Sequence, residues 1–266
     1  MAIYRPLKSV WQVLGSTGLE LFISDLEVRG ADVVPVPADY DGDGVTDIAR
    51  WTSSPGRWVV YESGNNYEST GETLLGSSRS IPVPADYDGD GIADIAVVEP
   101  GGLWQTVEGQ PRQFGRHGDI PVPADYDGDG TADIAVFRPS DGTWHVADQL
   151  EIGFGAPGDV PVPADYDGDG RVDGAVFRPS TATWYVRGQF QVTFGLPDDI
   201  PVPLDTDGDG RVELIVNRPT DGDWFLFDPL TGFSETIFYG EPGDVVASSP
   251  LFFRMIAMIA SSPDQQ

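Results

Sequence analysis

The stretch Asp39-Tyr40-Asp41-Gly42-Asp43-Gly44-Val45-Thr46-Asp47 places carboxylates at its first, third, fifth and ninth positions, with two glycines among them. A hard divalent cation such as calcium takes six to eight oxygen ligands at about 2.3 to 2.6 Å, which carboxylates and a backbone carbonyl can supply at this spacing. Gly44 allows the sharp turn that wraps such a loop around one ion. Without a cation, the four negative charges would repel one another at short range. The stretch therefore predicts a calcium-binding loop.

The same nine-residue pattern occurs five times, at residues 39–47, 86–94, 125–133, 165–173 and 205–213. The first residues of successive copies are 47, 39, 40 and 40 positions apart. A fixed period of this length indicates a repeat architecture, in which each repeat is one supersecondary unit.

One full period, residues 121–160, contains four short apolar runs separated by turn residues. Runs of four to six residues rich in Val, Ile, Phe and Trp, bounded by Gly, Pro and Asp, are typical of antiparallel strands. No window shows a sustained helical period. Because four strands in about 40 residues form the blade unit of a β-propeller, we expect an all-β fold of four-stranded antiparallel blades.

Tryptophans mark one more repeat than the acidic loops do. Six of them occupy equivalent places, at spacings of 47, 46, 40, 40 and 40: Trp11, Trp58, Trp104, Trp144, Trp184 and Trp224. This series predicts a six-bladed propeller formed by one domain over residues 1–266, with seven blades or part of a longer array as the alternative. The tryptophans themselves are expected to pack between blades rather than to line sugar pockets.

The two ends of the chain are predicted to close the ring by pairing. Residues 3–6 align with 136–139 and residues 243–246 align with 158–161, so the two ends would supply different strands of one blade. A second copy of the second strand, at 255–259, leaves open which copy closes the ring. The acidic pattern is absent at 248–253, so no sixth calcium ion is expected there.

Composition excludes several classes of partner. The net charge of −28 argues against nucleic acid or an anionic membrane surface, because both require a basic footprint. The five loops hold 20 of the 43 acidic residues, a pattern that a generally acidic surface does not explain. With no cysteine, disulfides and thiolate metal sites are excluded. No stretch could span a bilayer and no signal peptide is evident; we expect a monomer without membrane insertion.

The segment Phe154-Gly155-Ala156-Pro157-Gly158 followed by the acidic loop 165–173 resembles the FG-GAP repeat of the integrin α-subunit N-terminal region, also called VCBS-like. The resemblance covers nearly the whole chain. It implies a β-propeller whose calcium loops join the first and second strands of each blade, although integrin propellers have seven blades. Similar bacterial repeats occur in secreted and surface proteins, and fungal relatives act as lectins.

The resemblance also implies which atoms hold calcium: the carboxylates at positions 1, 3, 5 and 9 and the backbone carbonyl at position 7. The implied ligands are Asp39, Asp41, Asp43, Val45, Asp47, Asp86, Asp88, Asp90, Ile92, Asp94, Asp125, Asp127, Asp129, Thr131, Asp133, Asp165, Asp167, Asp169, Arg171, Asp173, Asp205, Asp207, Asp209, Arg211 and Glu213. Glu213 departs from the pattern, which puts full binding by the fifth loop in doubt. EF-hands are excluded, because their bidentate glutamate belongs at position 12, where this chain has Arg50 or valine.

The expected cofactor is Ca²⁺, about five ions with a structural role, because each loop lies within a repeat and metal binding couples to folding. Extracellular calcium modules fill at about 10⁻⁴ to 10⁻³ M, which predicts an extracellular or cell-surface location. The expected function is a binding or adhesion scaffold without catalysis, with a protein or glycan as ligand. One alternative is a calcium-dependent carbohydrate-binding lectin. Another is a propeller enzyme, a polysaccharide lyase or phosphatase, for which 15 basic residues and two histidines offer few catalytic groups.

Departures from the repeat predict where a ligand would bind. From tryptophan to the next Pro-Val-Pro takes 17 residues in three repeats but 24 after Trp11 and Trp58, and insertions in repeat proteins map to loops on one face. We therefore predict ligand contacts at Trp51, Asn65, Asn66 and Tyr67. The arginines of three Arg-Pro pairs, Arg138, Arg178 and Arg218, are interpreted instead as turn residues with a structural charge contact.

Overall fold

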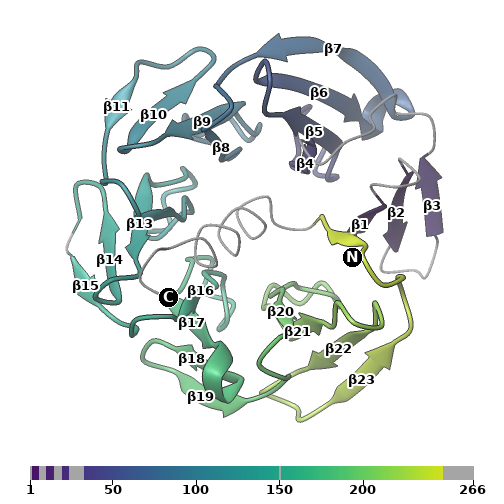
Figure 1. Ribbon diagram of the computed structural model, residues 1–266, viewed down its shortest axis with the longest axis vertical. Coiled ribbons are helices and arrows are strands. Elements are labelled where there is room, and N and C mark those ends of the chain that lie inside the picture. Colours follow the sequence, from purple (N-terminus) through teal and green to yellow (C-terminus); the bar gives the residue numbers. More distant parts are fainter. Residues whose placement is uncertain (1, 6–9, 15–19, 24–32, 150, 248–266) are drawn as a thin grey trace.

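The computed structural model describes residues 2–5, 10–14, 20–23, 33–149 and 151–247. These residues form four-stranded antiparallel sheets arranged as blades around a ring (Figure 1). No helix in these ranges has the length and apolar character that a membrane crossing requires.

Five blades are each built from four consecutive strands. Their bounds are β4 Val33–Pro35, β5 Ile48–Thr52, β6 Arg57–Glu62 and β7 Glu68–Leu74; β8 Ile81–Pro82, β9 Ala96–Glu99, β10 Leu103–Thr106 and β11 Arg112–Gln113; β12 Ile120–Pro121, β13 Ala135–Arg138, β14 Thr143–Val146 and β15 Ile152–Gly153; β16 Val160–Pro161, β17 Ala175–Arg178, β18 Thr183–Val186 and β19 Phe190–Thr193; β20 Ile200–Pro201, β21 Leu214–Asn217, β22 Trp224–Phe227 and β23 Ser234–Ile237. We number these blades 1 to 5. The first strand of each lies toward the centre of the ring (Figure 1).

One further four-stranded sheet combines strands from both ends of the chain. Strands β1 Ala2–Arg5, β2 Val10–Leu14 and β3 Glu20–Ile23 follow one another, and β24 Val245–Val246 from the other end pairs with β1. Ile3 lies opposite Val246 and Tyr4 opposite Val245, so the N-terminal copy of the second strand is the one that meets β24. Residues 255–259 lie outside the described part of the chain.

The prediction of a six-bladed propeller is therefore wrong. The described structure has five blades made of consecutive strands, each with an acidic loop closed by an antiparallel bridge such as Ala38 with Asp47. The tryptophan series overcounted these units, because Trp11 lies in the sheet assembled from both ends of the chain, where the sequence has no acidic loop. The described residues contain no further four-stranded sheet that would support seven blades or a longer array.

The proline-rich segments form very short strands at the inner side of each blade. In blade 3, Ile120 pairs with Phe137 and Pro121 with Val136, and the strand ends there. Proline cannot donate a ladder hydrogen bond, so it is tolerated at an edge strand. The short inner strand therefore reconciles Pro-Val-Pro with a sheet.

The core lies within and between the blades and is centred on the repeated tryptophans. Trp58, Trp104, Trp144, Trp184 and Trp224 are all at most 4% exposed. In blade 3 the Trp144 ring packs against Phe137 with their centroids 5.2 Å apart, and its indole Nε1 donates to the Phe154 carbonyl at 2.8 Å. These five side chains are thus core residues, as predicted, and offer no stacking surface to a sugar.

Candidate metal centres

Each acidic loop connects the first and second strands of its blade, as the resemblance implies. In blade 1, both carboxylate oxygens of Asp39 accept backbone N–H groups, from Gly42 at 2.7 Å and Gly44 at 2.8 Å. Asp41 accepts from the backbone of Asp43 at 3.1 Å, and Asp43 from that of Val45 at 2.7 Å. The loop backbone thus folds around its own carboxylates and points them inward.

The same hydrogen bonds recur in the other loops. The carboxylate at position 1 accepts from the glycines at positions 4 and 6 in every copy, at 2.6 to 3.0 Å. Three acidic residues of each loop bring one carboxylate oxygen apiece within 4.8 Å of one another. These groups are Asp39, Asp41 and Asp43; Asp86, Asp88 and Asp90; Asp125, Asp127 and Asp133; Asp165, Asp167 and Asp173; and Asp205, Asp207 and Glu213. All five loops could therefore hold a metal ion.

The acidic residue at position 9 shows whether the loop residues suit a bound cation. Asp47 is fully buried, and its two oxygens accept only neutral backbone donors, Tyr40 at 2.7 Å and Ser63 at 2.6 Å. A buried carboxylate without a positive partner is costly, and no basic side chain pairs with Asp47 among the described residues. The all-oxygen donor set and the uncompensated charge both fit a hard cation.

The corresponding carboxyl groups of three other loops are partly buried. Burial raises the pKa of Asp94, Asp133 and Asp173, a backbone N–H from the tyrosine at position 2 lowers it, and nearby loop acids raise it again. These carboxyl groups are therefore harder to ionise than free ones, and a bound cation would favour their ionised form.

Two sets of supporting residues were missed by sequence reasoning. The tyrosine hydroxyls at position 2 donate to a backbone carbonyl four residues upstream, at 2.7 to 2.8 Å: Tyr40, Tyr87, Tyr126 and Tyr166. Gln149 and Gln189 donate to the position 9 carboxylates of Asp133 at 3.0 Å and Asp173 at 2.8 Å. The signal was present in the sequence, because both sets recur with the period.

The fifth loop differs in more than the length of Glu213. Thr206 replaces the tyrosine and donates to Glu213 from its backbone at 2.8 Å and from its hydroxyl at 2.6 Å. Arg211 forms an ion pair with Asp209 at 2.6 Å. One candidate ligand is thus already paired with a cationic side chain, which any metal ion would have to displace or tolerate.

The four predicted ligand contacts do not lie together on the surface. Asn65 and Asn66 are exposed and Tyr67 is partly exposed, at the 3₁₀ turn Ser63–Asn65 and the residues after it. Trp51 is fully buried, and its Nε1 donates to the Leu75 carbonyl at 3.2 Å. The prediction that Trp51 contacts a ligand is wrong, because its strand register gives it the same buried place as Phe137 and Phe177.

The 3₁₀ turn instead contacts the first acidic loop. The Ser63 hydroxyl donates to Asp43 at 3.0 Å and the Gly64 N–H to Asp41 at 3.3 Å. Burial raises the pKa of Tyr67, and the charges of Asp47 and Asp43 raise it further. The longer segment of blade 1 therefore covers a candidate metal loop.

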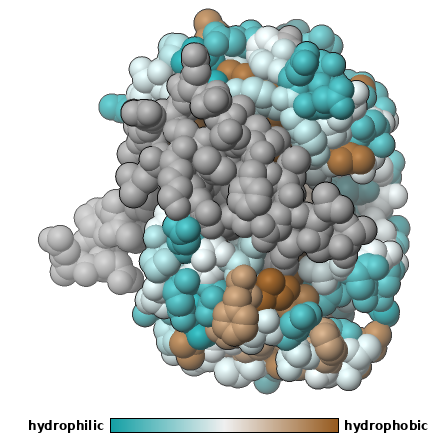
Figure 2. Space-filling view, turned by 90° about the vertical axis from the view of Figure 1, so that its right-hand side faces the viewer, coloured by the Kyte–Doolittle hydropathy of each residue, from teal (hydrophilic) through white to brown (hydrophobic). Residues whose placement is uncertain are grey.

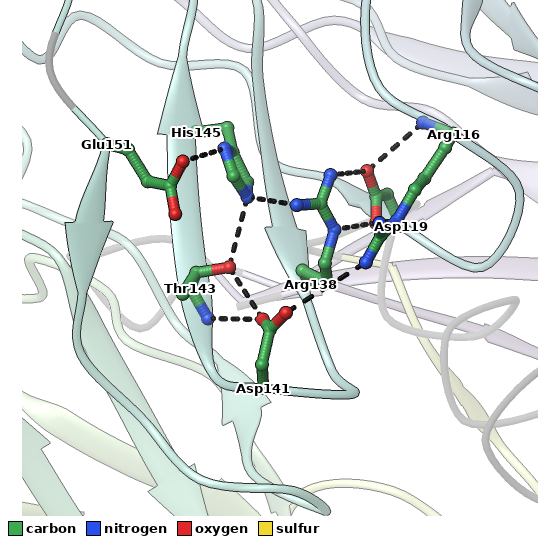
Figure 3. A network of polar contacts seen from close by, with 7 residues as sticks. All are labelled: Arg116, Asp119, Arg138, Asp141, Thr143, His145 and Glu151. Carbon is green, nitrogen blue, oxygen red and sulfur yellow. Dashed lines mark hydrogen bonds and ion pairs between the residues drawn. The ribbon is translucent and has the colours of Figure 1, made fainter.

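The Arg-Pro arginines form the structural charge contacts that were predicted. Arg138, Arg178 and Arg218 each bind both oxygens of a buried aspartate 19 residues upstream, at 2.7 to 2.9 Å: Asp119, Asp159 and Asp199. In blade 3, Arg138 also contacts Nε2 of His145 at 2.6 Å, and Nδ1 of His145 lies 3.3 Å from Glu151 (Figure 3). Because Arg138 can only donate, that histidine nitrogen serves as an acceptor in a structural network.

One cleft between blades is markedly more apolar than its counterparts. Between blades 4 and 5, a cleft of about 470 Å³ is lined by Phe190, Val192, Phe227 and Leu230, with Asp167 and Arg211 at its polar part. At the equivalent junctions, the cleft between blades 1 and 2 includes Glu62 and Glu72, and the cleft between blades 2 and 3 includes Arg112, Asp127 and Asp133.

Exposed apolar side chains continue from this cleft over blade 5. Leu230, Phe233 and Phe238 are 68, 56 and 83% exposed. Figure 2 shows hydrophobic surface at its lower end, on the side of the ring where β22 and β23 lie. Large exposed apolar groups on an ordered surface mark candidate interaction sites.

The fold and the loops define a β-propeller whose blades carry candidate metal centres. Residues 39–97 match the family model of the FG-GAP-like repeat, which confirms the predicted resemblance to an FG-GAP, integrin-like propeller. No curated protein matches the chain.

Two solved structures are similar to this chain at low sequence identity, and the first of them shares its fold. A lectin of Agrocybe aegerita, described for its specific recognition of non-reducing terminal N-acetylglucosamine, is 14% identical with a TM-score of 0.57, covering 94% of this chain and 85% of the lectin. BBS1N, in complex with ARL6DN and soaked with lead, is 10% identical with a TM-score of 0.49, covering 77% of this chain and 67% of BBS1N.

Proposed function

We propose that this protein is a calcium-stabilised β-propeller that serves as a binding or adhesion scaffold outside the cell or at its surface, without catalytic activity. The observation that supports the metal best is the buried carboxylate of Asp47, which has only neutral donors inside a loop of further carboxylates. Its partner would be a protein or a glycan, bound by a monomeric propeller without nucleic acid or membrane insertion.

In this proposal the carboxylates at positions 1, 3, 5 and 9 and the carbonyl at position 7 of each loop hold Ca²⁺. The ion compensates the loop charges and fixes the connection between the first two strands of a blade. Such a role needs calcium near the millimolar level at which extracellular modules fill, which is why we place the protein outside the cell.

Thermal unfolding with and without EDTA, combined with calcium counting by mass spectrometry, tests the metal. We expect four to five bound ions per chain, with the fifth loop as the uncertain one, and a lower melting temperature after chelation. A stoichiometry near zero with an unchanged melting temperature would refute the calcium proposal.

The apolar cleft between blades 4 and 5 supports the binding role. Replacing Leu230 with serine removes an exposed apolar side chain from the cleft rim, so it should leave the melting temperature unchanged while weakening partner capture. The matched control is Leu74→Ser, an equally exposed leucine on blade 1. Equal capture by both variants would exclude the cleft.

A lectin is the second candidate, favoured by the structural similarity, over 94% of this chain, to a lectin that recognises non-reducing terminal N-acetylglucosamine. A glycan array probed in calcium and again in EDTA distinguishes the two. Calcium-dependent glycan binding would establish the lectin, whereas a blank array would favour a protein partner.

A further inference from the structure

Consecutive acidic loops are joined to one another by backbone hydrogen bonds between blades. The N–H of the residue at position 8 of one loop donates to the carbonyl at position 1 of the loop before it. The four bonds are Ala93 to Asp39 at 2.7 Å, Ala132 to Asp86 at 2.6 Å, Val172 to Asp125 at 2.8 Å and Val212 to Asp165 at 3.0 Å. Each bond therefore links two backbones that both carry candidate metal ligands.

The side chain at position 7 makes a second contact in the same direction. A Cβ built on Gly42, Gly89, Gly128 or Gly168 would lie only 2.8 to 3.0 Å from the residue at position 7 of the next loop. Those residues are Ile92, Thr131, Arg171 and Arg211. Position 4 therefore needs glycine for two reasons. Its backbone has a positive φ, and the next loop leaves no space for a side chain there.

Because of these two contacts, the residues at positions 7 and 8 of each of these loops also touch the loop before it. In the second loop, Ile92 would offer its carbonyl to one ion while its side chain lies on Gly42 and the following N–H binds Asp39. An ion that fixes residue 92 therefore also supports the carboxylate loop of the blade before it. By thermodynamic reciprocity, filling either loop must favour filling of the other.

We propose that the five loops bind calcium as a linear array with positive coupling between neighbours, rather than as five independent sites. This inference rests on the proposed calcium binding. The array has two ends: Val45 of the first loop is half exposed, and a Cβ on Gly208 of the fifth loop would meet no atom within 4 Å. Loops in the middle have two supporting neighbours and loops at the ends have one.

The test removes one middle site and follows the others. The double substitution Asp127→Asn and Asp129→Asn removes two carboxylates of the third loop, and hydrogen exchange of each loop is measured by mass spectrometry across a calcium titration. We expect the calcium midpoints of the second and fourth loops to rise by about 5-fold or more, while the first and fifth loops change much less. The charge-matched control is the double substitution Asp198→Asn with Glu108→Gln, two exposed residues outside the loops.

A second variant covers the case in which the middle substitution prevents folding. Asp41→Asn with Asp43→Asn removes an end site, and only the second loop should then shift. Unchanged midpoints in the neighbouring loops of either variant would overturn the coupling while leaving calcium binding intact. A wild-type protein in which no loop gains protection with calcium would instead refute calcium binding itself.

Discussion

At the scale of single residues, the buried aspartate–arginine pair is the most uniform polar contact of blades 3 to 5. Asp159 is 1% exposed and binds both Nε and Nη2 of Arg178. Blade 2 has Ser80 and Glu99 at the equivalent places, and the Ser80 hydroxyl donates to Glu99 at 2.6 Å. Blade 2 thus differs from blades 3 to 5 at both residues of the pair, which indicates that the two positions act as one unit.

Replacing Arg178 with alanine should destabilise the protein strongly, because it leaves the Asp159 carboxylate buried without its partner. We expect a loss of about 3 kcal/mol in the free energy of unfolding, the lower end of the usual range because the guanidinium is partly exposed. The double variant with Asp159→Ala should recover part of this loss. Urea denaturation measures all three.

Arg112→Ala is the matched control, since Arg112 pairs with Asp148 at 2.7 Å on the surface. Exposed pairs contribute at most about 1 kcal/mol. Equal losses for Arg112→Ala and Arg178→Ala would contradict the distinction between the two pairs.

The sequence predicted that the Arg-Pro arginines make charge contacts, but it did not identify the aspartates that they bind. The charge contact of Arg138 was expected, whereas Asp119 directly precedes β12 and meets Arg138 only through the register of β12 with β13. The error at Trp51 has the same origin, because an unusual residue type was interpreted as a surface contact without regard to the direction that its strand position imposes.

At the scale of elements, the turn between the second and third strands lies directly against the Phe-Gly segment that follows the fourth strand. In blade 3, the Phe154 N–H donates to the Gly142 carbonyl at 3.0 Å. A Cβ on Gly142 would lie 2.4 Å from the Gly155 carbonyl carbon. The glycines of the repeated motif thus let two backbone segments of one blade touch.

Gly142→Ala should therefore lower the melting temperature by about 4 to 8 °C, which corresponds to about 2 kcal/mol in a protein of this size. The clash is with backbone, and the positive φ of 70° at Gly142 adds strain. Differential scanning calorimetry measures the change.

Gly153→Ala provides the control in the same blade, because its new Cβ would have no atom within 4 Å and its φ is not positive. That variant should melt within about 2 °C of the wild type. A similar loss for both variants would mean that the close approach at Gly142 is not the cause.

The sequence predicted the elements well wherever their pattern was local. Alternating apolar runs and turn residues identified four strands per period, and the acidic loops fell between the first two strands as expected. The covering of the first loop by Ser63 and Gly64 was not predictable, because it depends on a longer hairpin folding back across its own blade.

At the scale of the whole molecule, the ring is closed by the two-residue pairing of β24 with β1. Residues 1–14 contain β1 and β2, and their deletion would leave the edge of β24 unpaired. We expect the truncated protein to melt at a lower temperature and to self-associate, since exposed strand edges recruit other chains. Light scattering and calorimetry check both effects, and an unchanged monomer with the full-length melting temperature would contradict this role.

The blade count was the part of the global fold that sequence periodicity could not settle. Tryptophan spacing counts strands of one type, but it does not show whether the strands of one sheet are consecutive. Sequence alignment predicted that both ends of the chain supply the sheet that holds Trp11, but only the pairing of Ile3 with Val246 shows which copy of the second strand meets β24.

The pairing of β1 with β24 also determines how the ring would respond to mechanical force. The strands run antiparallel, so the start of β1 and the end of β24 lie at the same end of the pair. Tension applied through residues 2 and 246 would load the hydrogen bonds one after another, as in a zipper, rather than all together in shear. With so few bonds at that seam, each contributing about 0.5 to 1.5 kcal/mol, the ring would open there before the acidic loops of the five blades bear any load.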